Sequence, residues 1–108
     1  MNGKYIQDVM NVTEGAEGAA LVELIETNRE AGRALADIEW CASQYSRATD
    51  ESKAVLRERM AHDAATLEDL SGGAVSFQTA WKSGIDLAMT VDLNPERRQR
   101  VGCGVIIR

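Results

Sequence analysis

The sequence predicts an all-α protein, in which an antiparallel helical hairpin and additional short helices form a small helical bundle completed by dimerisation. Three observations support this fold class. The composition is typical of helices, because the 108 residues include one proline and only 5% aromatic residues. A heptad-spaced apolar row occupies residues 21–45. A second apolar row, which consists of Leu56, Met60, Ala64, Leu67 and Leu70, is followed by Ser71, Gly72 and Gly73, a sequence that typically ends a helix.

The first apolar row predicts one long helix over residues 16–45. Its positions alternate in steps of three and four, so that they share one face of the helix. The row consists of Leu21, Leu24, Asn28, Ala31, Leu35, Ile38, Ala42 and Tyr45. Asn28 is the one amide in the row. We interpret Asn28 as a register device that excludes alternative helix pairings.

The second apolar row predicts a helix over residues 50–71, with Thr49 or Asp50 as its cap. The short connection between the two helices favours an antiparallel hairpin. Asp63 lies on the packing face of the second helix, where Arg59 precedes it by one turn. We therefore expect Asp63 to contribute to the helix pairing as part of an ion pair with Arg59 at the edge of the seam.

The remaining segments are assigned around this hairpin within a single helical domain, residues 1–108. Residues 1–15 form an N-terminal arm with a short helix. Residues 74–92 form a further amphipathic helix, and residues 95–108 form a basic C-terminal segment.

A second apolar line indicates a protein interface on the predicted long helix. This line lies about 120° around the helix from the first row. It consists of Val22, Ile25, Gly32, Ala36 and Trp40. Trp40 is the expected hot spot, and Asp37 and Glu39 are the expected rim charges. The line can be covered within the monomer, by a twin in a homodimer or by another protein, and the sequence leaves these alternatives open.

The charge of the chain is unevenly distributed. Residues 1–94 contain 8 Lys or Arg against 16 Asp or Glu, whereas residues 95–108 contain 4 against 1. An acidic body repels phosphate, so we expect no direct binding of nucleic acid and favour a basic protein partner. Arg97 and Arg98 in the basic segment are further candidates for the protein interface.

The sequence contains no convincing motif for catalysis, metal binding or nucleotide binding. The one histidine, His62, follows Glu58 by one turn, but two ligands are too few for a metal site. We interpret this pair as a surface ion pair. The expected protein is therefore not an enzyme, and it needs no cofactor, metal or small-molecule ligand.

The expected compartment is the cytoplasm. No stretch of eighteen apolar residues is present, so we expect no association with a membrane. Cys41 and Cys103 fall in no metal-binding pair, and we expect both to be free thiols.

In size, charge and helix layout the chain resembles the quorum-sensing antiactivators, small helical proteins that bind a LuxR-type transcription factor. The resemblance lies in the helices over residues 16–91 and their acidic surroundings. It implies a regulatory module that sequesters a transcription factor and blocks its dimerisation or DNA binding, with Val22, Ile25 and Trp40 as contact anchors. The alternative is a secretion chaperone or structural adaptor that uses the same apolar face.

Overall fold

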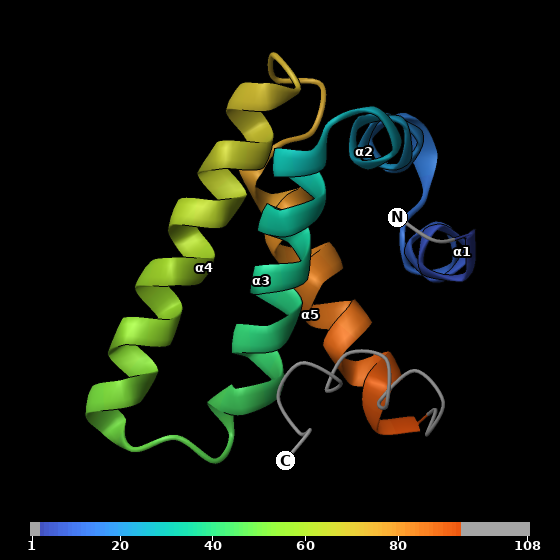
Figure 1. The fold of residues 1–108 in the computed structure, drawn as a ribbon. Helices are drawn as coiled ribbons and strands as arrows, with labels where there is room; N and C mark the ends of the chain where they lie inside the picture. Colours follow the sequence, from blue (N-terminus) through green and yellow to red (C-terminus); the bar gives the residue numbers. More distant parts are fainter. Residues whose placement is uncertain (1–2, 94–108) are drawn as a thin grey trace.

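The computed structural model describes residues 3–93 and contains five helices in this part of the chain (Figure 1). The helices are α1 (Gly3–Val12), α2 (Gly15–Thr27), α3 (Arg29–Tyr45), α4 (Asp50–Leu70) and α5 (Phe77–Leu93). No strand occurs between residues 3 and 93, and the predicted all-α fold class is confirmed.

α3 and α4 form the antiparallel hairpin that the sequence predicts, connected by a short turn (Figure 1). Thr49 caps α4, because its side-chain oxygen accepts a hydrogen bond from the backbone nitrogen of Ser52 at 3.1 Å. α4 ends before Gly72 and Gly73, whose positive φ angles of 64° and 91° suit glycine. Local capping signals therefore define both ends of α4.

α5 packs against the hairpin and completes the core. The core includes the fully buried side chains of Leu35 and Ile38 on α3, Leu67 on α4 and Leu87 on α5. α5 approaches α3 so closely at Gly84 that a Cβ atom there would overlap the side chain of Ile38. A glycine is therefore required where these two helices cross.

The predicted long helix over residues 16–45 is wrong, because the chain leaves the helical conformation at Asn28. This residue is extended, with φ −132° and ψ 111°, and separates α2 from α3. Its side-chain oxygen accepts a hydrogen bond from the backbone nitrogen of Ala31 at 3.1 Å, which caps α3. Asn28 is therefore a helix cap, and the predicted register device inside one continuous helix does not exist.

α1 and α2 form a second helical pair beside the hairpin (Figure 1). A short turn leads from α1 to Gly15, the first residue of α2, whose φ is 74°, and Gly18 lies directly against Thr13. Val9 on α1 is fully buried in the common core. The segment predicted as an N-terminal arm is thus an integral part of the fold, and the predicted basic segment over residues 95–108 lies outside the described residues.

Candidate protein-binding surfaces

The helix break at Asn28 separates the residues of the predicted second apolar line. Figure 1 shows α2 nearly end-on where α3 is seen from the side, so the two helices cannot share one continuous face. Val22 is partly exposed on α2, whereas Ile25 is only 3% exposed and packs in the core. Ala36 is exposed and Trp40 half-buried on α3. The structure therefore removes Ile25 as a contact anchor and distributes the other residues over different surfaces.

The two predicted rim charges also lie in environments that the sequence did not indicate. Glu39 is only 1% exposed, and the hydroxyl group of Tyr5 donates a hydrogen bond to its Oε1 at 3.4 Å. Glu39 is thus a buried acid that connects α3 with α1 and not a rim charge. Asp37 is half-buried and forms an ion pair with Arg59 across the hairpin.

An acid pair joins α3 to α4 within the hairpin. Arg59 pairs with Asp37 and not, as the sequence suggested, with Asp63. Burial, together with a hydrogen bond to Asp37 and its negative charge, raises the pKa of Asp63 to about 8. Asp63 is therefore mainly protonated at neutral pH and donates a hydrogen bond to Asp37, while its own Oδ2 is buried without a hydrogen bond.

Cys41 lies beside this acid pair as a buried free thiol, as predicted, whereas Cys103 lies outside the described residues. Its Sγ donates a weak hydrogen bond to Oδ2 of Asp37 at 3.8 Å. Burial and the charge of Asp37 raise the pKa of Cys41 to about 11. Because the thiolate is the reactive form, this thiol is poorly suited to nucleophilic chemistry.

Trp40 borders a hollow at the turn of the hairpin, which we call the α3/α4 hollow. The hollow has a volume of about 540 Å³ and is lined by Trp40, Val55 and Leu56, among others. Val55 is 56% exposed. The guanidinium group of Arg59 lies 5.4 Å from the centre of the Trp40 ring, in a position to make a cation–π contact. Trp40 is therefore engaged within the molecule.

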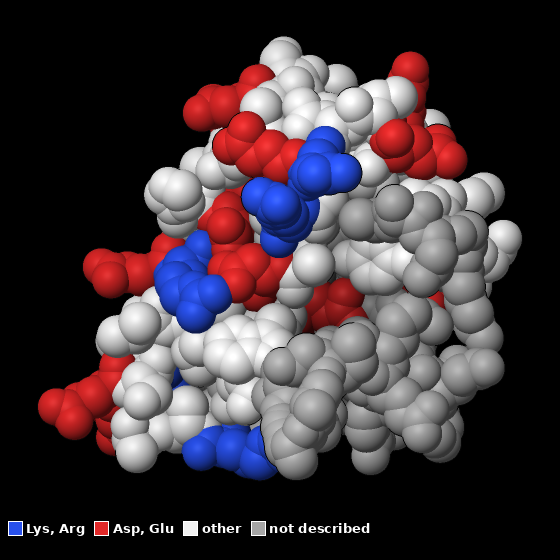
Figure 2. All heavy atoms as spheres, viewed as in Figure 1, with Lys and Arg blue, Asp and Glu red and all other residues white. Residues whose placement is uncertain are grey.

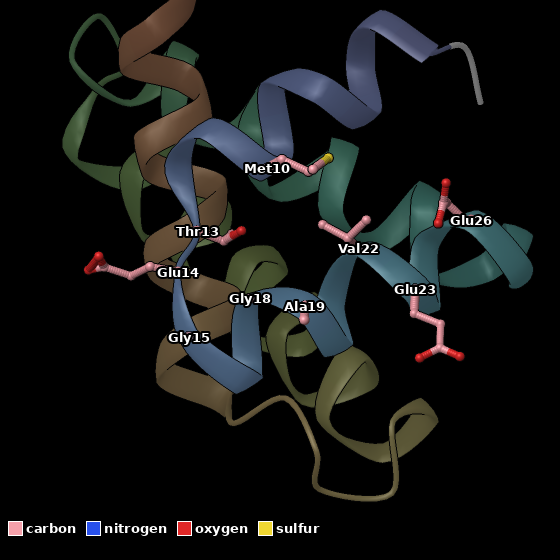
Figure 3. Close-up of a pocket in the computed structure, with 9 residues that line it drawn as sticks. All are labelled: Met10, Thr13, Glu14, Gly15, Gly18, Ala19, Val22, Glu23 and Glu26. Atoms are coloured by element: carbon pink, nitrogen blue, oxygen red, sulfur yellow. The ribbon is translucent and has the colours of Figure 1, made fainter.

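A second hollow lies between α1 and α2, and we call it the α1/α2 groove (Figure 3). Its volume is about 330 Å³. The apolar lining is formed by Met10 of α1 and by Gly18, Ala19 and Val22 of α2. Met10 is 52% exposed, so that much of its flexible side chain remains open to solvent. Small residues along α2 keep the groove open beneath Met10 and Val22.

The charged residues that line the α1/α2 groove are all acidic. Glu14 lies on one side of Met10 and Val22, and Glu23 and Glu26 lie on the other (Figure 3). Within the described part of the chain these carboxylates form no ion pair. The pKa of Lys82 is raised mainly by its ion pair with Asp86 at 2.8 Å, and Glu14 contributes least to this shift. The negative charge of the groove is therefore largely unneutralised.

The α1/α2 groove and the α3/α4 hollow differ in the charges that surround them. Figure 2 shows acidic side chains over the α2 end of one face, and basic and acidic side chains together over α3, α4 and the turn between them. The α3/α4 hollow is lined by both Arg47 and Glu51. A third hollow, of about 290 Å³ between α3, α4 and α5, has Arg57 as its charged lining residue. Of these three hollows in the described part of the chain, the α1/α2 groove alone combines an apolar lining with exclusively acidic charge.

The sequence pattern did not predict the α1/α2 groove, although it predicted that Val22 contacts a partner. The useful signal was the run of small residues around Gly18, which permits a close approach of α1 to α2. Met10 could not be assigned to a groove until the direction of α1 was known.

No group of three His, Cys, Asp or Glu suited to a metal ion occurs among the described side chains. His62 is exposed on α4. Between residues 3 and 93 no helix combines the length and apolar character needed to cross a membrane. Arg97 and Arg98, the remaining predicted interface residues, lie outside the described residues.

Residues 3–93 thus form a five-helix bundle with apolar hollows on its surface, of which the α1/α2 groove is the acidic one. In comparisons with known proteins, no family model, curated protein or solved structure matches this chain.

Proposed function

We propose that this chain is a regulatory module that binds a transcription factor and blocks its dimerisation or its binding to DNA. The observation that supports this proposal is the α1/α2 groove, in which an open apolar lining lies among unpaired carboxylates. Apolar contact provides affinity, and charge of one sign selects the partner and accelerates the encounter. A groove of this kind favours a protein partner with a basic surface.

The basic surface of a transcription factor is the one that contacts DNA. An acidic module seated there would compete with the phosphate backbone. The resemblance to quorum-sensing antiactivators in size and charge supports the same class of partner. Met10 and Val22 would supply the apolar contact, and Glu14, Glu23 and Glu26 would attract the basic groups.

We also propose that the chain forms a homodimer, since a domain of this size gains stability from association. Exposed apolar side chains on α5 support this part of the proposal. Phe77 is 36% exposed and stacks on Trp81, with ring centres 5.9 Å apart, and Met89 is 60% exposed. Sedimentation equilibrium over a range of concentrations would test it, and a monomer at all concentrations would contradict it.

An affinity capture with three proteins tests the regulatory proposal. Three baits are used in parallel: the wild-type chain, the Met10→Lys variant and the Val55→Lys variant. The proteins that each bait captures from the native cell extract are identified by mass spectrometry. Met10 and Val55 are similarly exposed apolar residues in the two hollows, at 52% and 56%. Val55→Lys is therefore a matched control for the loss of an apolar side chain and the gain of a charge.

We expect wild type and Val55→Lys to capture a transcription factor that Met10→Lys does not capture. Loss of the central apolar contact should weaken the complex by about 2 kcal/mol or more. Circular dichroism should show equal helix content in all three proteins. Capture of an exported protein in place of a regulator would contradict the proposal and favour the secretion chaperone.

A further inference from the structure

We propose that the occupant of the α1/α2 groove is a basic amphipathic helix of the partner, which inserts apolar side chains between Met10 and Val22. This inference rests on the proposed function and names the chemistry of the partner at the same site. It follows from the size of the groove, the spacing of its carboxylates and the kind of residues that line it.

The size of the groove limits what can enter it. A helix with its side chains is about 10–12 Å across, so a hollow of about 330 Å³ cannot contain a whole helix. A partner helix would lie along the groove and insert only the side chains of its apolar face. Met10 suits this role, because its flexible thioether side chain adapts to different apolar groups.

The carboxylates fix the length of the partner helix. Glu14 directly precedes α2, and Glu23 and Glu26 lie near its C-terminal end. At a rise of about 1.5 Å per residue, these two ends are separated by roughly 13–18 Å along the helix. A partner helix aligned with α2 would therefore carry Lys or Arg about nine to twelve residues apart. Its apolar residues would lie between them at helical spacing.

Other modes of binding fit the groove less well. The described part of the chain offers no sheet edge to which an extended peptide could add a strand. Phosphate groups of nucleic acids or lipids would meet three carboxylates and no paired cation at the groove. An apolar helix with acidic flanks would meet the same repulsion. Charge and shape together favour a helix with basic flanks.

The test uses the full chain and two synthetic 15-residue peptides with the same helical pattern of leucines. One peptide carries lysine at its polar positions, and the other carries glutamate. Binding of each labelled peptide is measured by fluorescence anisotropy at low and at moderate salt. The proteins compared are wild type, Met10→Lys, Glu23→Gln and Val55→Lys.

We expect the lysine peptide to bind wild type at least about tenfold more tightly than the glutamate peptide. Met10→Lys should weaken its binding by at least about tenfold, and Glu23→Gln by about two- to fivefold with a smaller dependence on salt. Val55→Lys should bind as wild type does. Equal binding of both peptides, or full binding by Met10→Lys, would overturn the inference.

Two further outcomes identify a different occupant and also overturn the inference. In both outcomes described next, neither the lysine peptide nor the glutamate peptide binds to the wild-type chain. If Met10→Lys abolishes self-association of the chain, the occupant is a second copy. If a peptide of residues 95–108 binds the groove in their place, the occupant is the basic segment of this chain.

Failure of this inference can be distinguished from failure of the proposed function. Capture of a transcription factor through Met10, without binding of the lysine peptide, would refute only the basic helix. Binding of the lysine peptide, without capture of any regulator, would refute only the regulatory function.

Discussion

The α1/α2 groove and the interface between α3 and α4 both place carboxylates beside apolar side chains, but only the carboxylates of the interface are paired within the described part of the chain. In the hairpin, Asp37 is paired with Arg59 and accepts a hydrogen bond from the protonated Asp63. In the groove, Glu14, Glu23 and Glu26 line an open surface without ion pairs in the described part of the chain. Charges that are neutralised internally support the fold, whereas unpaired charges remain available to a partner.

This difference follows from the position of each acid relative to the hairpin interface. Asp37 and Asp63 face each other across two packed helices, where partial burial makes an unpaired charge costly. The glutamates of the groove are exposed, and water solvates them at little cost until a partner displaces it. Substitutions in the two regions should therefore affect different properties, stability in the hairpin and binding in the groove.

The largest effect on stability is expected for Asp37→Ala. This change removes the partner of Arg59 and the hydrogen-bond acceptor of Asp63 together. Because Arg59 is partly solvated, we expect a loss of about 2–3 kcal/mol in the free energy of unfolding. Urea denaturation followed by circular dichroism would measure it.

The same variant sharpens the comparison when its binding is measured. Asp37→Ala should bind the basic peptide as wild type does, whereas Met10→Lys should lose binding and keep its stability. A large loss of peptide binding in Asp37→Ala, under conditions where it is fully folded, would contradict the separation of the two regions.

A smaller effect is expected from pH, through Asp63. Its pKa rises from an ordinary 3.8 to about 8 in the folded protein, so the folded state holds this proton where the unfolded chain releases it. Stability from this group is therefore greatest below about pH 4 and is lost as the pH rises towards 8. Since Asp63 is only partly buried, we expect the loss between pH 5 and 8 to be about 1–2 kcal/mol.

Asp63→Asn isolates this contribution, because an amide keeps a donor for Asp37 and does not titrate. The stability of wild type should fall more steeply between pH 5 and 8 than that of Asp63→Asn. Parallel pH profiles of the two proteins would show that Asp63 ionises in the folded state as it does in the unfolded chain.

The hairpin could be predicted from the sequence because its signals are local. The cap at Thr49, the glycines after Leu70 and the spacing of Leu35 and Ile38 each depend on a few neighbouring residues. The position of Asp63 on a packing face was also readable. The acid that pairs with Arg59 could not be predicted, because the choice between Asp37 and Asp63 depends on how the two helices face each other.

The groove could not be predicted because it depends on the angle between segments. An apolar row that continues through Asn28 is compatible with one long helix and with two helices that meet at a cap. Asparagine is favoured in both settings, as a polar seam residue and as an N-cap. Only the path of the chain at this residue determines that Val22 and Trp40 lie on separate surfaces.

The smallest effect is expected for Asn28→Ala, which tests the junction between the two regions. Loss of the hydrogen bond to the backbone nitrogen of Ala31 should reduce stability by about 1 kcal/mol. Asn28→Ser retains a capping oxygen and should remain close to wild type in stability.

If Asn28 were instead an amide within a helix seam, an apolar substitution would raise the stability, because replacing a buried polar residue by an apolar one would stabilise the helix pairing. Thermal denaturation of Asn28→Leu therefore distinguishes the two roles: a lower melting temperature supports the cap, and a higher one would restore the continuous helix.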